Sequence, residues 1–373
     1  MNIGFDAKRI VHNDTGLGSY SRTLINDLSE IIPADTRLWL YAADKGHKTL
    51  RHQVTLKDNV QFRYSNTDAP KWWWREHAII KDLVRDRIQI FHGLSGELPV
   101  GIKKTGIKTV VTIHDLIFLR YPNYYNWFDR KIYEWKFRRT IQEADRIIAI
   151  SECTKRDIML LGDVPPEKIR LIYQSCNTFY KLRESEDKLE AVNARYMLPP
   201  RYIINVGTIE ERKNVLLAVK ALHRLPEDIS LVIVGHRRPY AEQVDRYVEE
   251  NRLQNRVKIL QDVPNTDLPA IYQMAEVCVY PSRYEGFGIP VIEAIQSGLP
   301  VVACTGSCLE EAGGNDTLYV DPDDVVAMAE AIKSVLKGVE GRDLRIARAQ
   351  KYISRFEGND VATQMLNVYR ELL

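Results

Sequence analysis

The sequence predicts an α/β protein with two doubly wound parallel sheets that follow one another along the chain. Short apolar runs alternate with helical patterns, which is typical of parallel strands joined by helices. The same alternation restarts near residue 201. The length of 373 residues also suits two domains of ordinary size.

The expected strands are short, mostly apolar runs bounded by turn residues. In the first half of the chain they are 2–6, 37–42, 59–64, 88–92, 108–113, 146–150 and 168–173. In the second half they are 202–206, 230–234, 257–260, 277–280, 300–304 and 317–320.

Helical patterns fill the intervals between these strands. The clearest are 19–31, 131–144, 216–225 and 325–336, and a last one covers 358–373. The charged segment 181–195 has no strand pattern, so we place the link between the domains around 176–200. We expect one domain at 1–178 and the other at 179–357.

The composition is that of a globular protein with a proper core, at 45% hydrophobic and 27% charged residues. A net charge of +2 gives no reason to expect nucleic acid as a partner. Five cysteines form no disulfide framework, and we expect reduced thiols. The sequence shows no secretion signal and no apolar run of about 20 residues, so we expect a cytoplasmic protein.

The most informative stretch is 276–304, which reads as a strand, a loop, a short helix and a second strand. Gly286 and Gly288 allow the backbone to approach a ligand closely. Pro290 suits the start of a helix, where a missing N–H has no cost. The stretch therefore places the N-terminus of a helix behind a glycine loop, which is a favourable site for phosphate.

Two carboxylates, Glu285 and Glu293, frame this site. Paired acceptor oxygens match a sugar diol. We interpret the stretch as a nucleotide-sugar site, with Glu293 on the ribose diol and Glu285 on the transferred sugar. The alternative is that Glu293 only favours the helix N-terminus and that Glu285 is a solvated loop residue.

The run E-G-F-G-I-P-V-I-E, from Glu285 to Glu293, resembles the E-x7-E signature of retaining GT-B glycosyltransferases, in particular family 4. The flanking strand, the Pro-Ser pair and S-G-L-P-V-V resemble the family as well. The resemblance covers nearly the whole chain. It implies two Rossmann-like domains that face each other across a cleft: an acceptor domain first, then a donor-binding domain. It also implies a C-terminal helix, 358–373, that crosses back to the first domain.

A glycine pair follows the first expected strand, in Thr15-Gly16-Leu17-Gly18-Ser19. We expect a loop here, with Ser19 as the N-cap of the next helix. The position three after Gly18 is serine, so this is not a full dinucleotide fingerprint, and the alternative is an ordinary flexible loop. The resemblance implies that Gly16 and Gly18 approach the donor's diphosphate or sugar.

A histidine ends the expected strand 108–113, in Thr112-Ile113-His114-Asp115. A lone histidine is often structural, but the carboxyl end of a strand is where ligands bind in such sheets. The resemblance implies that His114 contacts the transferred sugar. We expect Asp115 to hold the loop in shape.

Two cations follow the first strand of the second half, in G-T-I-E-E-R-K-N from Gly207. Arg212 and Lys213 are suited to neutralising a diphosphate, and the alternative is a solvated basic pair. The resemblance implies that they grip the donor phosphates. Thr208 stands where other members of the family have arginine, and the shorter loop resembles mannosyltransferase-like members. Gly235 ends a further strand, and we expect its loop to approach the nucleotide.

The resemblance implies retaining transfer of a hexose from a nucleoside diphosphate sugar, GDP-mannose or a UDP-hexose, to a saccharide or lipid-linked acceptor of surface glycan biosynthesis. The leaving-group charge would be taken by the two cations and by the N–H groups near the helix start, at Phe287, Gly288 and Ile289. No cofactor and no metal are expected. Asp321-Pro322-Asp323 spells the D-x-D of metal-dependent enzymes of another fold, but an acidic helix start explains it equally well.

Three other functions stay open on the residues alone. A sugar-nucleotide-binding protein without transfer activity would lose the geometry at His114 or Glu285. An epimerase or phosphorylase shares the two-domain fold. A nicotinamide-dependent dehydrogenase is disfavoured by the missing third glycine.

Two segments, 71–75 and 120–139, mix aromatic with basic residues. Packing of the rings inside the protein is the simplest interpretation. The alternative is a surface that stacks an acceptor saccharide or touches the anionic inner face of a membrane.

Overall fold

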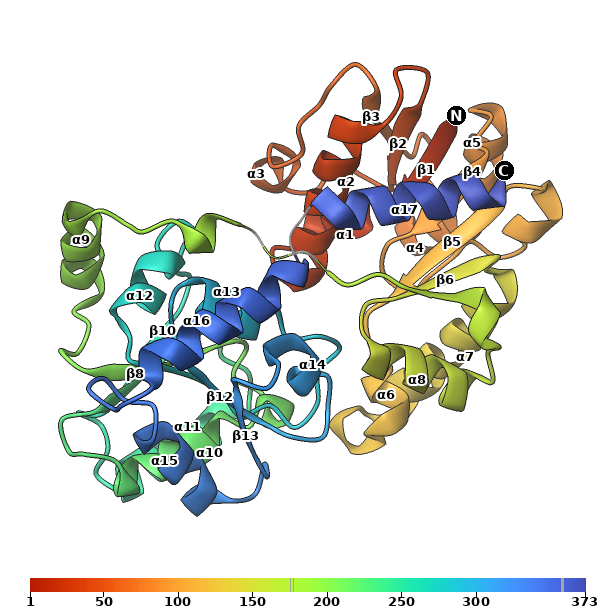
Figure 1. The fold of residues 1–373 in the computed structure, drawn as a ribbon. Helices are drawn as coiled ribbons and strands as arrows, with labels where there is room; N and C mark the ends of the chain where they lie inside the picture. The colour runs from red at the N-terminus through yellow and green to blue at the C-terminus, as the bar shows by residue number, and fades with distance from the viewer. Residues whose placement is uncertain (175, 177, 357–358) are drawn as a thin grey trace. The chain divides into compact units, whose positions relative to one another are not determined.

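The computed structural model describes residues 1–174, 176, 178–356 and 359–373. The chain divides into two compact units (Figure 1). The first comprises Met1–Ser175 and Gly358–Leu373, and the second comprises Cys176–Glu357. The expected boundary at 357/358 falls on residues outside those described.

The first unit is built on a parallel sheet of seven strands, in the order β3-β2-β1-β4-β5-β6-β7. Its strands are β1 Asn2–Asp6, β2 Arg37–Ala42, β3 Val60–Tyr64, β4 Ile90–Gly93, β5 Lys108–Ile113, β6 Arg146–Ala149 and β7 Ile169–Leu171. Strand β1 pairs with β2 on one side and with β4 on the other. The strand order reverses between β1 and β4, and ligands of such sheets bind outside the carboxyl ends of strands at this point.

The second unit repeats the plan with six parallel strands, in the order β10-β9-β8-β11-β12-β13. They are β8 Tyr202–Val206, β9 Ser230–Val234, β10 Val257–Leu260, β11 Val277–Tyr280, β12 Val301–Cys304 and β13 Leu318–Val320. Here the order reverses between β8 and β11. All thirteen expected strands are therefore present, each within two residues of its expected ends.

Helices cover both sheets. Those of the first unit include α1 Lys8–His12, α2 Gly16–Ile31, α4 Lys71–Trp73, α5 Ile79–Arg85, α6 Ile117–Arg120, α7 Trp127–Glu143, α8 Glu152–Gly162 and α17 Asn359–Leu372. Those of the second include α9 Glu186–Tyr196, α10 Val215–Ala221, α11 Ala241–Glu250, α12 Leu268–Met274, α13 Ile289–Gln296, α14 Leu309–Gly313, α15 Val325–Lys333 and α16 Arg342–Ile353. Side-chain caps mark several starts: Asn126 for α7, Ser151 for α8 and Asp324 for α15.

The expectation for the first glycine segment was wrong. Helix α2 begins at Gly16 after Thr15, so Gly16 and Gly18 lie in its first turn rather than in a loop, and Ser19 is inside the helix. The reason is Asn13, whose side chain accepts hydrogen bonds from the N–H groups of Thr15 and Gly18, both at 3.0 Å. Asn13 thus stabilises the start of the helix, a role that the sequence had suggested for Ser19.

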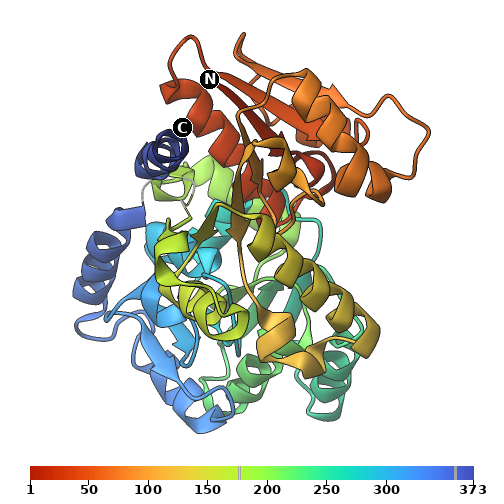
Figure 2. The ribbon, with the colours of Figure 1, turned by 90° about the vertical axis from the view of Figure 1, so that its right-hand side faces the viewer.

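The C-terminal helix α17 packs on the first unit, as expected. It lies along α2, and both views place the chain termini close together (Figures 1 and 2). Its apolar side joins a core with both helices and the sheet, through residues that include Val361, Met365 and Tyr369.

A buried chain of hydrogen bonds ties α17 to the sheet. His92 at the end of β4 is fully buried, with Nδ1 2.7 Å from the Tyr369 hydroxyl and Nε2 2.9 Å from the Thr112 hydroxyl. Tyr20 on α2 extends the chain to Thr112 at 3.2 Å. Burial lowers the pKa of His92 to about 3, so the ring is neutral.

Replacing Tyr369 by Phe tests this tie. The ring packing is kept, but one buried nitrogen of His92 loses its partner, which should cost about 1–3 kcal/mol of stability. Urea unfolding followed by circular dichroism would measure the loss. The matched control is Arg370→Ala, because Arg370 is exposed on the same helix; an equal effect of both changes would contradict the role of the bond.

Candidate active site

The carboxyl ends of β8 and β11 bring together three of the expected site residues in the second unit. Lys213 Nζ lies 2.6 Å from Glu285 Oε1, and Arg212 Nη1 lies 3.0 Å from Glu285 Oε2. The cations come from a single turn, Glu211–Lys213, after β8, and the carboxylate comes from the loop after β11. All three side chains are largely buried.

The ion pairs decide the charge state of Glu285. Burial alone raises the pKa of a carboxyl, but the charges of Lys213 and Arg212 more than offset it and lower the pKa of Glu285 to about 2. Glu285 is therefore a carboxylate at any physiological pH. Glu285 is only 8% exposed, which excludes the alternative that it is a solvated loop residue.

Tyr280, the last residue of β11, completes this cluster and was missed by the sequence analysis. Its hydroxyl lies 2.8 Å from Lys213 Nζ and 3.3 Å from Glu285 Oε1. The ammonium group also lies 5.1 Å from the centre of the Tyr280 ring. The available signal was the position of a polar aromatic residue at a strand end.

Arg212 has two further partners that fix its guanidinium group. It donates to the Tyr284 carbonyl at 2.5 Å and pairs with Glu210 at 2.6 Å. Both cations are thus held in place by protein groups.

The N-terminus of α13 lies next to this cluster in sequence, and its geometry matches the expectation. Gly288 precedes the helix with φ +111°, a conformation that side chains rarely adopt. Among the described residues, no acceptor binds the Ile289 N–H. The Phe287 ring is buried against Phe356, so the backbone rather than the ring is the part of Phe287 suited to contact a ligand.

The buried thiol of Cys308 stabilises the loop that precedes α13. Its Sγ donates to the carbonyls of Glu285 and Phe287, at 3.1 and 2.9 Å. No role for this cysteine is visible in the sequence, because its spacing does not show that the segment after β12 packs against this loop.

Glu293 lies in the second turn of α13, in a different environment from Glu285. It is partly buried, and its Oε2 accepts a hydrogen bond from Tyr272 at 3.3 Å. Burial raises the pKa of Glu293 to about 7, although hydrogen bonds from Tyr180 and Tyr272 act in the opposite direction. Both tyrosines were missed, since they come from distant parts of the sequence.

The two glycines after β8 and β9 pack on one another. A Cβ on Gly235 would lie 2.0 Å from the Gly207 carbonyl oxygen, which explains why a side chain is excluded there. Gly207 itself stands beside the Lys213 side chain. Their direct contact with a nucleotide stays a prediction.

In the first unit, His114 follows β5 with both ring nitrogens engaged. Nε2 donates to the Leu94 carbonyl at 2.9 Å, and Nδ1 accepts from the Gln174 amide at 2.9 Å. Burial lowers the pKa of His114 to about 4, so the ring is neutral. The imidazole is therefore fixed in one tautomer, and its contact with a sugar stays a prediction.

Gly18 also has a packing role, since a Cβ there would lie 1.9 Å from the Asn13 carbonyl oxygen, whereas Gly16 has open space around its Cα. Asp115 accepts a hydrogen bond from the Ile117 N–H at 3.2 Å and so stabilises the start of α6.

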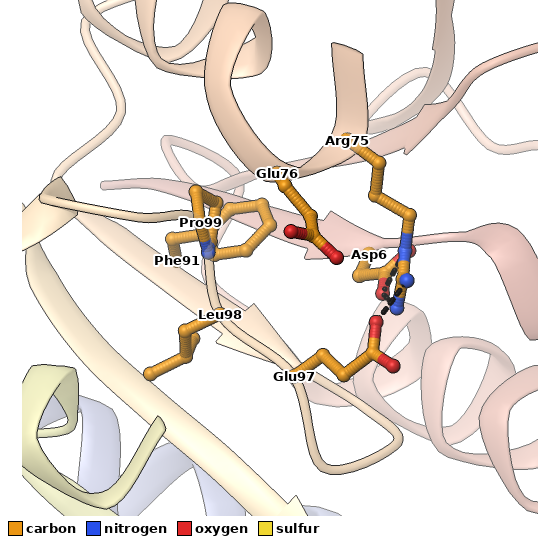
Figure 3. Close-up of a pocket in the computed structure, with 7 residues that line it drawn as sticks. All are labelled: Asp6, Arg75, Glu76, Phe91, Glu97, Leu98 and Pro99. Atoms are coloured by element: carbon orange, nitrogen blue, oxygen red, sulfur yellow. Dashed lines mark hydrogen bonds and ion pairs between the residues drawn. The ribbon is translucent and has the colours of Figure 1, made fainter. Parts of the chain in front are cut away.

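A second polar cluster lies at the reversal point of the first sheet (Figure 3). Arg75 pairs with Asp6 at the end of β1, at 2.5 Å, and with Glu97 after β4. The adjoining cavity has a volume of only about 10 Å³, room for one water at most. The cluster is therefore a rigid support in this structure rather than a substrate pocket.

The D-x-D residues are engaged with protein groups. Asp323 pairs with Arg283, and Asp321 accepts from the Asp323 N–H at 2.8 Å. In the described ranges, no group of three or more His, Cys, Asp or Glu side chains is arranged to hold a metal ion. No helix among the described residues has the length and hydropathy to cross a bilayer.

Comparison with known proteins identifies the class. The family described as "Glycosyl transferases group 1" matches residues 194–352, and "Glycosyltransferase Family 4" matches residues 16–178. The structure of Anabaena Alr3699/HepE in complex with UDP and glucose superposes with a TM-score of 0.78, at 15% identity and over 100% of both chains. The two doubly wound units have the GT-B fold, and the two family matches identify the chain as a glycosyltransferase of that fold.

Two relatives match over nearly their full length. O-antigen chain mannosyltransferase B of Escherichia coli is 29% identical over 100% of both chains. O-antigen chain mannosyltransferase RfbU of Salmonella typhimurium is 25% identical over 96% of this chain and 97% of its own. The chain belongs to the group 1 glycosyltransferases.

The environment of Glu293 predicts a pH dependence of stability. Its pKa is about 7 in the folded protein and lower, near the model-peptide value of about 4.3, when unfolded. The folded state therefore binds the proton more tightly, and this contribution to stability is full below pH 4 and is lost as the pH rises through 7.

Wild-type protein should accordingly lose more thermal stability between pH 5 and 8 than Glu293→Gln, which cannot titrate. Differential scanning calorimetry at several pH values would measure both curves. Parallel curves would show that Glu293 titrates normally.

Proposed function

We propose that the chain is a retaining hexosyltransferase that moves a hexose from a nucleoside diphosphate sugar to a saccharide or lipid-linked acceptor in surface glycan biosynthesis. The observation that carries the proposal is the buried cluster of Arg212, Lys213 and Glu285 beside the N-terminus of α13. Two fixed cations and a helix N-terminus provide charge stabilisation for a departing diphosphate.

The roles follow from the charges. Lys213 and Arg212 stabilise the negative charge that develops on the leaving diphosphate, together with N–H groups near Gly288 and Ile289. Glu285, fixed as a carboxylate, accepts hydrogen bonds from the transferred sugar. Its two oxygens are already held by cations, so it acts as an orienting group and not as a covalent nucleophile. The acceptor attacks from the leaving-group face, and a phosphate oxygen takes its proton.

Glu293 binds the ribose diol in this proposal. Tyr272 and Tyr180 both donate to this carboxylate, and the diol would bond to the acceptor sites of the two oxygens that these hydroxyls leave. The family resemblance assigns three residues of the first unit to the donor. These are His114, for the transferred sugar, and Gly16 and Gly18 at the start of α2, for the diphosphate or the sugar.

The relatives support mannose as the sugar, because two of them are O-antigen mannosyltransferases. GDP-mannose is therefore the first donor to test, and UDP-hexoses are next, since Anabaena HepE binds UDP and glucose. No metal is required, because Arg212, Lys213 and the helix N-terminus supply the positive charge. A lipid-linked acceptor would bring the reaction to a membrane surface.

A sugar-nucleotide-binding protein without transfer activity is the second candidate. It would need the donor site alone. The ion-paired Glu285 favours the enzyme, because in this proposal it orients the transferred sugar and a protein that only binds the nucleotide would not need it.

Lys213→Ala should lower kcat about 100- to 1000-fold, because a fixed charge at the leaving group is lost. The rate of nucleoside diphosphate release, after subtraction of the rate without acceptor, would measure kcat. Lys220→Ala is the control: this lysine lies on α10 near Tyr247 and away from the cluster. Wild-type turnover at saturating donor would show that Lys213 is only a structural cation.

Calorimetric titration with UDP, GDP, ADP and CDP, each with and without EDTA, tests the donor site. One nucleotide should bind tightly and equally in both buffers, and Glu293→Ala should weaken it by about tenfold for the lost diol bonds. Binding that EDTA abolishes would overturn metal independence. Failure of all four nucleotides would overturn the transferase proposal.

A further inference from the structure

All exposed aromatic side chains of the described residues lie in two short segments. They are Trp72, Trp73, Trp127, Phe128, Tyr133 and Trp135. The chain has 34 aromatic residues other than histidine, so this grouping is far from a random scatter. The simplest interpretation of the sequence, that these rings pack inside, is wrong for these six.

Helix α7 carries the main part of this surface. Trp127, Phe128, Ile132 and Trp135 are 59%, 74%, 50% and 57% exposed. At 100° per residue they fall on one side of the helix, over about 12 Å of its length. The opposite side is buried through Phe137 and Thr140. We call these four residues the aromatic face; α7 is the long olive helix on the outside of the first unit in Figure 2.

Cations border the aromatic face. Lys131 and Arg138 lie on the same side of the helix, are 52% and 53% exposed, and both pair with Glu134, at 3.5 and 3.1 Å. The Arg139 guanidinium lies 4.6 Å from the centre of the Trp135 ring. Between residues 127 and 139 there are five lysines and arginines but only two carboxylates, whereas the whole chain has a net charge of only +2.

The second aromatic segment is fixed to α7 by ion pairs. Glu76, three residues after Trp73, lies 2.8 Å from Lys136 and 3.5 Å from Arg139. The two aromatic segments are therefore joined at these ion pairs in the first unit.

We propose that the aromatic face of α7 docks on an anionic lipid bilayer. Rings of tryptophan and phenylalanine bordered by lysine and arginine match the interface of acyl chains and anionic headgroups. At least half of each of the four residues is exposed, whereas a sugar pocket would cover the rings, so a stacked saccharide is the weaker choice. With Glu76 counted, five cations stand against three carboxylates, and the remaining positive charge suits anionic lipid better than an identical surface on a second copy.

Cosedimentation with vesicles tests the proposal, and it is independent of donor binding and of transfer. The full chain should bind vesicles of phosphatidylcholine with 40% phosphatidylglycerol and should not bind pure phosphatidylcholine. The triple change Trp127→Ser, Phe128→Ser, Trp135→Ser should lower the partition coefficient at least about tenfold, because the apolar area that enters the interface is lost. Lys131→Gln with Arg138→Gln should lower it about thirtyfold at low salt.

The control for the triple variant is Leu182→Ser, Met197→Ser, Leu344→Ser. These side chains are as exposed, at 67%, 75% and 57%, but lie in the second unit. Control binding should equal wild type. The proposal is overturned if the wild-type chain ignores anionic vesicles, or if the two triple variants bind equally. It is also overturned if the aromatic face supports a concentration-dependent dimer in light scattering or binds an oligosaccharide in solution.

Discussion

The buried ion-paired carboxylate Glu285 is the constraint on which the second unit depends. A buried charge is tolerated only where partners compensate its desolvation. Lys213 and Arg212 do so from the turn after β8, and Tyr280 adds a hydroxyl from the end of β11. Strands β8 and β11 are neighbours only because the strand order reverses between them. The topology therefore creates the cluster, and the cluster fixes two loops at the edge where a ligand binds.

In the proposed function, the same constraint holds the two cations in fixed positions before a diphosphate binds. Arg212 is shared between Glu285 and the more exposed Glu210, while Lys213 is shared between Glu285 and Tyr280. In the proposed reaction, the arriving diphosphate would replace the more exposed Glu210 as a partner of Arg212 and leave Glu285 in place. Preorganised charges of this kind need little rearrangement during the reaction, which is the main source of electrostatic catalysis.

The sequence was sufficient for the sheets, because strands buried on both faces read as short apolar runs with few alternatives. It was insufficient where a single side chain overrides local preference. The side chain of Asn13 stabilises a start of α2 at Gly16, three residues before the predicted N-cap. The N-cap is therefore Thr15, although serine is preferred over threonine at this position. The candidate site could be proposed from the sequence where its residues are close along the chain, as from Glu285 to Glu293. The sequence did not predict the roles of Tyr180, Tyr272 and Cys308, because only folding brings them close to α13 and the loop before it.

The first unit shows how a surface helix can be connected rigidly to a sheet edge. Lys136 on α7 lies 2.8 Å from Glu76 and 3.4 Å from Glu97. Glu97 in turn pairs with Arg75, and Arg75 with Asp6 at the end of β1 (Figure 3). The links are charged and mostly shielded from water, so they are screened little by salt. A bilayer that held the aromatic face would thereby fix the height and tilt of the carboxyl edge of this sheet above the lipid. An acceptor anchored in that lipid would then meet the edge at a constant distance, which is the condition for a peripheral enzyme to position a reacting hydroxyl.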